Sequence, residues 1–322
     1  MKKIGLIVVL LSIILAACSQ TEDEVKLVGE PSVDTNTSDT VKVDEFSSVI
    51  EKGEFYKEND SEVINHIHGA GFIAGSDALF VATHHGLKAF LDGKWYETIS
   101  DKHDYMGFQP TNDGFFASGH PEEGSKLSNP FGLIKSQDYG QTLEQLAFYG
   151  ESDFHYLAAG YNSHVVYVIN EHENSTLDRG LFYSLDQGQS WEKSKISGIP
   201  NAGISNIAAH LTEASTIAIG TEVGLYLSKN NGDVFELFSE EVNVTALAFT
   251  DTEVYFSTAE NELIKQSLNT NENESIELPS FENGDMVMYI AISPNNRDEL
   301  VIVTSKSNIY RTTDHGNQWD QL

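Results

Sequence analysis

The chain has 322 residues, of which 40% are hydrophobic and 10% aromatic, so it can bury a core and is not disordered as a whole. Its 19 basic and 49 acidic residues give a net charge of −30. This charge repels phosphate backbones and argues against nucleic acid as a partner. A single cysteine excludes an intramolecular disulfide and a cysteine-rich zinc module.

The first 17 residues are typical of an export signal. Two lysines precede an apolar run from Ile4 to Ala17, which is too short to cross about 30 Å of hydrocarbon as a helix. The run ends in Leu15-Ala16-Ala17-Cys18, which resembles a bacterial lipobox. We therefore predict a lipoprotein signal peptide over 1–17, lipidation of Cys18, and anchoring at the outer face of the cell membrane. The alternative is an ordinary secretion signal followed by an incidental cysteine.

Residues 18–44 are predicted to form a disordered acidic tether behind the lipidated cysteine. From Ser19 to Asp44 there are seven acidic residues, two lysines and no aromatic side chain. Such a segment cannot bury enough apolar area to offset its chain entropy. The alternative is a docking segment for a basic partner.

Residues 45–322 are predicted to form one repeat domain. A short strand that opens with Gly-Leu or a close variant recurs six times, and an apolar run rich in β-branched and aromatic residues precedes each copy. No window shows sustained helical periodicity. Six units of about four strands predict an all-β, six-bladed β-propeller, with blades at about 62–99, 102–147, 151–195, 201–239, 241–279 and 284–322. Phe46 to Tyr56 is expected to add a closing strand to the last blade, and a seven-bladed ring is the alternative.

A hairpin motif follows the Gly-Leu strand in four units. It resembles the Asp-box, or bacterial neuraminidase repeat, Ser-x-Asp-x-Gly-x-Thr-Trp. The aspartate or asparagine is expected to cap backbone N–H groups of a tight hairpin, the glycine to supply a positive φ, and the aromatic ring to pack against the blade. The residues in these roles are Asp138, Gly140, Asp186, Gly188, Trp191, Asn230, Gly232, Asp314, Gly316 and Trp319.

The chain resembles bacterial surface lipoproteins of the sortilin-like, or glycosyl hydrolase-like, Asp-box class. The segments that carry the likeness are His-Ile-His-Gly at 66–69, His-His-Gly-Leu at 84–87, Asp-Tyr-Met-Gly-Phe at 104–108, Ser-Gly-His-Pro at 118–121 and Asp-Phe-His at 153–155. Asp-box propellers also include sialidases. A sialidase needs three convergent arginines, and Arg179, Arg297 and Arg311, the three present, are not placed to meet, so we reject that activity.

When the six units are aligned, one position of the innermost strands holds His68, Met106, His155, Ser205, Thr245 and Met288. Alternation along a strand places these six side chains on one side, toward the channel of the ring. Imidazole with thioether suits copper, and imidazole with carboxylate suits zinc, manganese or iron. We therefore predict a ligand site at the channel mouth, with copper or zinc as the expected metal. Its residues are His66, His68, His84, His85, Met106, His120, His155 and Met288. The alternative is a water-filled channel lined by satisfied polar groups.

Two further functions stay open at this point. Asp104 and Asp153 hold matching positions on adjacent blades, and two carboxyl groups about 6.5–9.5 Å apart can run inverting glycoside hydrolysis. The other alternative is a surface scaffold for a protein partner, cationic because the chain is strongly acidic, or for a glycan. We favour binding over catalysis, and we expect a monomer.

Overall fold

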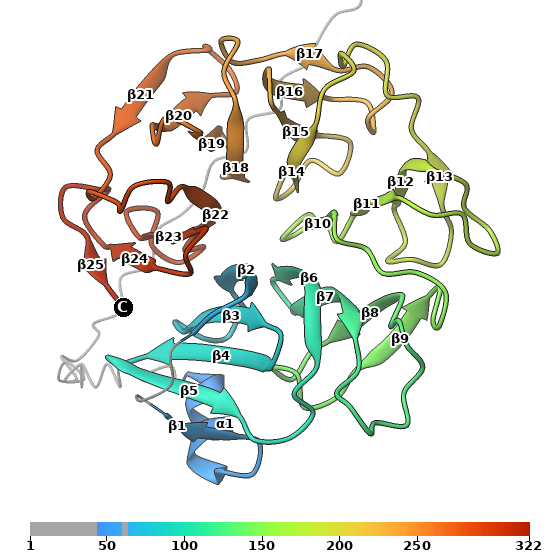
Figure 1. Cartoon of the computed structure of the whole chain (residues 1–322), viewed down its shortest axis with the longest axis vertical. Coiled ribbons are helices and arrows are strands. Elements are labelled where there is room, and N and C mark those ends of the chain that lie inside the picture. Colours follow the sequence, from blue (N-terminus) through green and yellow to red (C-terminus); the bar gives the residue numbers. More distant parts are fainter. Residues whose placement is uncertain (1–43, 60–63) are drawn as a thin grey trace, which may run out of the picture. The chain divides into compact units, whose positions relative to one another are not determined.

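The computed structural model describes residues 44–59 and 64–322. Six antiparallel sheets stand in a ring, and each forms a blade of four strands (Figure 1). The described part of the chain has one short helix. The predicted six-bladed propeller is confirmed, and the alternative of seven blades is excluded. The predicted signal peptide, Cys18 and the tether up to residue 43 lie outside the described residues.

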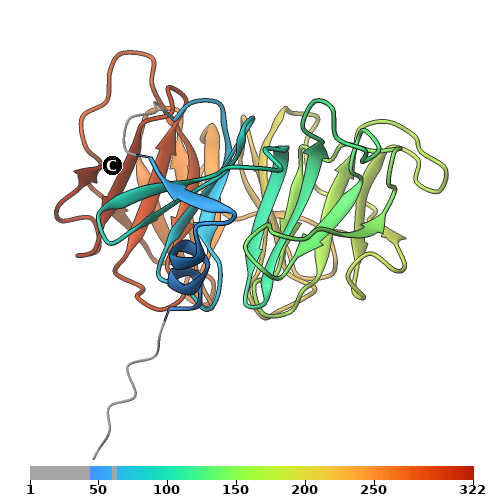
Figure 2. The same ribbon diagram turned by 90° about the horizontal axis from the view of Figure 1, so that it is seen from below.

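Within each blade the strands follow chain order from the ring centre outward (Figures 1 and 2). Blades 1 to 3 consist of β2 (Ile67–Phe72), β3 (Leu79–Thr83), β4 (Gly86–Leu91) and β5 (Lys94–Thr98); β6 (Asp104–Thr111), β7 (Gly114–His120), β8 (Leu133–Ser136) and β9 (Glu144–Ala147); β10 (Leu157–Ala159), β11 (Val166–Asn170), β12 (Gly180–Ser184) and β13 (Glu192–Lys193). Blades 4 to 6 consist of β14 (Ile204–Ala209), β15 (Ile217–Thr221), β16 (Gly224–Ser228) and β17 (Glu236–Leu237); β18 (Val244–Phe249), β19 (Glu253–Thr258), β20 (Leu263–Ser267) and β21 (Asn273–Ile276); β22 (Val287–Ile292), β23 (Leu300–Thr304), β24 (Ile309–Thr312) and β25 (Asp320–Gln321).

The predicted closing strand between Phe46 and Tyr56 is wrong. This segment forms helix α1 (Glu45–Lys52) and then β1 (Tyr56–Glu58), which pairs with β5 as a fifth strand at the outer edge of blade 1. Local signals explain the helix. The Asp44 side chain accepts a hydrogen bond from the backbone N–H of Ser47, and Gly53 ends the helix with a φ of +61°. Eight residues make only about two helical turns, too few for a sustained helical periodicity in the sequence.

Each seam between neighbouring blades holds its own cluster of buried apolar side chains, so every blade is covered on both faces. The seam that closes the ring is of the same kind. Val301 and Val303 of blade 6 pack with Ile67 and Val81 of blade 1. The last blade is completed by its own strand β25. Among the described residues the ring is therefore closed by apolar packing, with no strand exchanged between its two ends.

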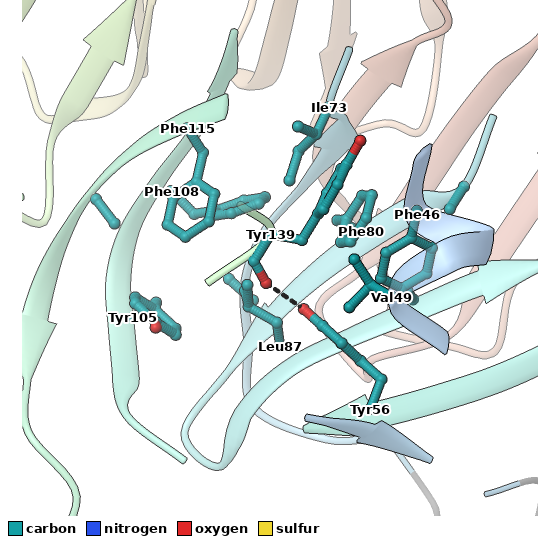
Figure 3. Packing of buried hydrophobic residues seen from close by; sticks show 14 of the residues in the cluster. Phe46, Val49, Tyr56, Ile73, Phe80, Leu87, Tyr105, Phe108, Phe115 and Tyr139 are labelled. Atoms are coloured by element: carbon teal, nitrogen blue, oxygen red, sulfur yellow. Dashed lines mark hydrogen bonds between the residues drawn. The ribbon is translucent and has the colours of Figure 1, made fainter. Parts of the chain in front are cut away.

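The largest of these clusters lies at the seam of blades 1 and 2 and includes α1 (Figure 3). Phe46 of α1 is fully buried, with ring centroids 4.9 Å from Tyr56 and 4.8 Å from Phe80. The Tyr56 hydroxyl donates to the backbone carbonyl of Tyr139 at 2.8 Å (Figure 3). The helix therefore fastens the start of the described chain to two blades at once.

We expect Phe46→Ala to lower the free energy of unfolding by about 3–5 kcal/mol, because it leaves a cavity among packed aromatic rings. Urea denaturation followed by circular dichroism measures the loss. Glu51→Ala on the exposed side of the same helix is the control and should change stability little. Equal stability of both variants would show that α1 contributes nothing to the fold.

Four hairpins each form the same pattern of hydrogen bonds. They lie at the four positions where the sequence motif occurs. In blade 3, Asp186 Oδ1 accepts from the backbone N–H of Ser190 at 2.8 Å and Oδ2 accepts from the Ser190 hydroxyl at 2.6 Å. The backbone N–H of Gly188 donates to Ser184 at 2.7 Å, and its φ of +93° favours glycine. Asp138, Asn230 and Asp314 accept the equivalent backbone bond in blades 2, 4 and 6.

The hydrogen bonds from Ser190 lower the pKa of Asp186 to about 2. A carboxyl group whose pKa is lower in the folded chain stabilises the fold above its unfolded pKa of about 3.9 and loses this contribution as pH falls through its folded value. We expect the Asp186 carboxyl carbon to titrate near pH 2 in an NMR experiment. Ser190→Ala should move that midpoint upward, and an unchanged midpoint would contradict the assigned cause.

The innermost strands carry a β-bulge at the same position in five of the six blades. One residue of each strand has no partner in the register with the next strand, and these residues are His68, Met106, Ser205, Thr245 and Met288. A bulge bends a strand and re-aims its side chains, and bulges gather near functional sites. The position aligned in the sequence is therefore a bulge position in these five blades.

No helix among the described residues is long and apolar enough to cross a membrane.

Candidate functional site

A channel of about 310 Å³ runs between the innermost strands. His68, Met106, His155 and Ser205 line it at the end where these strands begin. The second strands of the blades end on the same side, since they run antiparallel to the first. Histidines and aspartates from both kinds of strand end therefore meet at this end, which we call the polar mouth.

The first cluster at the polar mouth joins blades 1 and 2. His84, just after β3, donates from Nδ1 to Asp104 Oδ2 at 2.7 Å, because a carboxylate can only accept. This hydrogen bond leaves the lone pair of His84 on Nε2, which lies 3.2 Å from His68 Nε2. Asp104 Oδ1 is buried without a hydrogen-bond partner among the described residues, 3.9 Å from His68 Nε2.

His68, His84 and Asp104 are the one group in the described chain in which each residue offers a metal-ligand atom within 4.8 Å of the others. The His68 side chain is 18% exposed and that of Asp104 21%. Burial, followed by the nearby His84, lowers the pKa of His68 below its usual value. The neutral imidazole is the form that ligates a metal, so the site favours the protonation state that a cation requires.

The second cluster repeats this arrangement one blade further around the ring. His120 lies at the end of the second strand of blade 2, β7, and Asp153 lies just before the first strand of blade 3, β10. In the first cluster, His84 and Asp104 hold the corresponding places in blades 1 and 2. Asp153 Oδ2 lies 3.0 Å from His120 Nε2 and 3.2 Å from His155 Nε2. Asp153 Oδ1 is buried without a partner among the described residues. Asp104 and His120 are register partners on β6 and β7, so one strand pair connects the two clusters.

Neighbouring residues orient both imidazoles of the second cluster. His120 Nδ1 lies 2.6 Å from Asn129 Oδ1, and His155 Nδ1 lies 3.2 Å from Glu171 Oε2. Each Nε2 therefore points at Asp153. In this cluster both imidazoles approach the same carboxylate oxygen. Its ligand atoms do not all lie within 4.8 Å of one another, as those of the first cluster do.

The remaining predicted site residues lie at the edge of these clusters or outside them. The ring centroid of His66, an exposed residue with a φ of +50°, is 5.1 Å from that of His84. His85 is exposed and is not a member of the group that its neighbour His84 joins. Met106 lines the channel, whereas at the Met288 bulge it is the next residue, Tyr289, that does so.

No sequence signal marks the residues that orient the histidines, Asn129 and Glu171, and Asn206 on the channel wall was not predicted either. Asn129 lies in a loop and Glu171 just after β11. No repeat marks their positions. Asn206 and Tyr289 each follow a bulge residue directly, so the same alignment of innermost strands, taken one position further, would have found them.

Each of the two predicted catalytic aspartates is approached by two histidines. Asp104 meets them through both carboxylate oxygens, whereas Asp153 meets them through Oδ2 alone. Two of the three arginines are engaged in ion pairs, Arg297 with Asp251 and Arg311 with Glu299.

The comparisons with known proteins agree with the fold. The family model of sortilin and neurotensin receptor 3, Sortilin-Vps10, matches residues 132–282. This segment runs from blade 2 to blade 5 and makes the chain similar to sortilin-type propellers over that part. No curated protein sequence matches the chain.

Among solved structures, the GH74 xyloglucanase of Xanthomonas campestris is similar with a TM-score of 0.51 and 16% identity, over 83% of this chain and 47% of that one. The GH74 enzyme of Niastella koreensis has a TM-score of 0.53 and 14% identity over the same shares. The extracellular domain of a putative hybrid two-component system of B. thetaiotaomicron has a TM-score of 0.51 and 14% identity over 83% and 34%. The chain thus spans about half the length of the two GH74 enzymes and about a third of the length of the extracellular domain. At these sequence identities the similarity shows a shared fold.

Proposed function

We propose that this protein is a lipid-anchored extracytoplasmic propeller that binds a divalent transition-metal ion, Zn²⁺, between His68, His84 and Asp104. The observation that supports it is the convergence of two imidazole nitrogens and one carboxylate oxygen. His84 Nε2 and His68 Nε2 are 3.2 Å apart, and Asp104 Oδ1 is a buried orphan beside them.

The donor spacing fits a tetrahedral ion. Zn–N distances of 2.0–2.1 Å place two ligands of a tetrahedral site about 3.3 Å apart, close to the separation of the two Nε2 atoms. The His84–Asp104 hydrogen bond would hold the imidazole in the tautomer that offers Nε2 to the metal. Two imidazoles and a carboxylate suit zinc. Three protein ligands leave a fourth position open toward the mouth.

We expect the full chain, purified in detergent and stripped with chelator, to bind Zn²⁺ in isothermal titration calorimetry. His84→Ala should weaken binding by more than the roughly 10–100-fold that loss of an outer-shell partner costs, because it removes a ligand and frees Asp104. Asp104→Asn, which keeps the side-chain shape, should weaken it similarly. His85→Ala removes the adjacent exposed histidine and should leave affinity unchanged. Binding that survives His84→Ala and Asp104→Asn would reject this site.

The anchoring part of the proposal rests on the lipobox-like sequence before Cys18. A diacylated cysteine holds a protein firmly at a membrane. In a bacterial host fed labelled palmitate, the chain should take up label and sediment with membranes. Cys18→Ser should abolish the label. Ser19→Ala is the control, and an unlabelled wild-type chain would exclude the anchor.

A further inference from the structure

The interior of the channel differs in chemistry from its polar mouth. Among the described lining residues, no lysine, arginine, aspartate or glutamate is present, and the histidines are those of the mouth. The walls combine aromatic residues, such as Tyr156 and Tyr289, with polar uncharged groups. A ligand inside the channel would therefore be neutral, because no wall residue could pair with a charge.

Four polar side chains of the wall have no hydrogen-bond partner among the described residues. They are Gln109 on β6, Asn206 on β14, Tyr289 on β22, and Tyr161, which follows β10. The first three come from blades 2, 4 and 6, which alternate around the ring (Figure 1). Two other polar wall groups are satisfied, since Ser205 donates to the carbonyl of Val244 and Tyr156 to that of Ile204.

The free groups define the kind of ligand. Two carboxamides offer both donors and acceptors, and a phenol offers both through one oxygen. Burial raises the pKa of Tyr289 to about 12, so this hydroxyl stays protonated at neutral pH. Hydroxyl groups on a ligand are matched partners because each can donate and accept. Aromatic walls would contact the carbon framework between those hydroxyls.

We propose that the channel below the polar mouth binds a small neutral polyhydroxy molecule of monosaccharide size, held by Gln109, Asn206 and Tyr289. A cavity of about 310 Å³ lies at the lower end of the range for small-molecule sites. The opposite end of the channel is lined mainly by apolar residues such as Phe72, Leu211 and Phe249, together with Arg297. We take the polar mouth as the entrance for a polyhydroxy ligand. This site goes beyond the proposed metal binding and does not depend on it.

The test uses the full chain in a detergent without a sugar headgroup, with EDTA present so that metal binding plays no part. The probes are D-glucose, D-xylose and myo-inositol, observed by saturation-transfer NMR and titrated by calorimetry. D-Glucuronate and cyclohexanol are the charged and apolar controls. We expect at least one neutral probe to bind at least tenfold more tightly than either control.

The variants are Asn206→Leu and Tyr289→Phe, of which the second removes one hydroxyl and keeps the ring. Each should weaken the bound probe roughly tenfold, because a ligand hydroxyl is left without its partner. Gln145→Leu, a carboxamide exposed on outer strand β9, is the matched control and should have no effect. The proposal is overturned if no neutral probe binds, if a control probe binds as tightly, or if both channel variants bind like the wild type. A failed zinc titration would leave these results unaffected.

Discussion

The structure depends on the burial of both faces of every blade against its neighbours. Central strands such as β3, β15 and β23 are buried along their whole length, and an apolar cluster fills each of the six seams. A four-stranded sheet with two apolar faces is insoluble alone, and a closed ring removes both faces from water. Because the last seam is built like the others, closure needs no exchanged strand.

Ring closure also places the beginnings of all innermost strands around one axis. The β-bulge recurs at this level in five blades, and it lets polar residues stand where regular pairing would continue the apolar seam. The polar mouth is thus a consequence of the repeat. Its asymmetry comes from composition, because the histidines and aspartates lie at or near this level in blades 1 to 3, whereas Ser205 and Thr245 occupy the bulges of blades 4 and 5.

Much of the fold could be predicted because repeats and hairpin motifs are local. The four hairpins lie where Ser-x-Asp-x-Gly and its variants occur, since Asp186 and its partners are within four residues of one another. Helix α1 escaped because its capping residues, Asp44 and Gly53, bracket only eight residues. Its position is decided by the fit of Phe46 between Tyr56, Phe80 and Tyr139, which are far apart in the sequence.

By itself the sequence determined the number of units and most of the strands within them, because these follow from period and alternation along one chain. It also predicted several of the residues at the mouth, among them His68, His84 and His120. Only the tertiary structure decided that His84 pairs with Asp104, that His120 and His155 share Asp153, and that Gln109, Asn206 and Tyr289 stay free inside the channel. The reason is that these relations join different blades. Distances across a seam or an axis are set by how packed sheets rotate around the ring, which no spacing within a single repeat records.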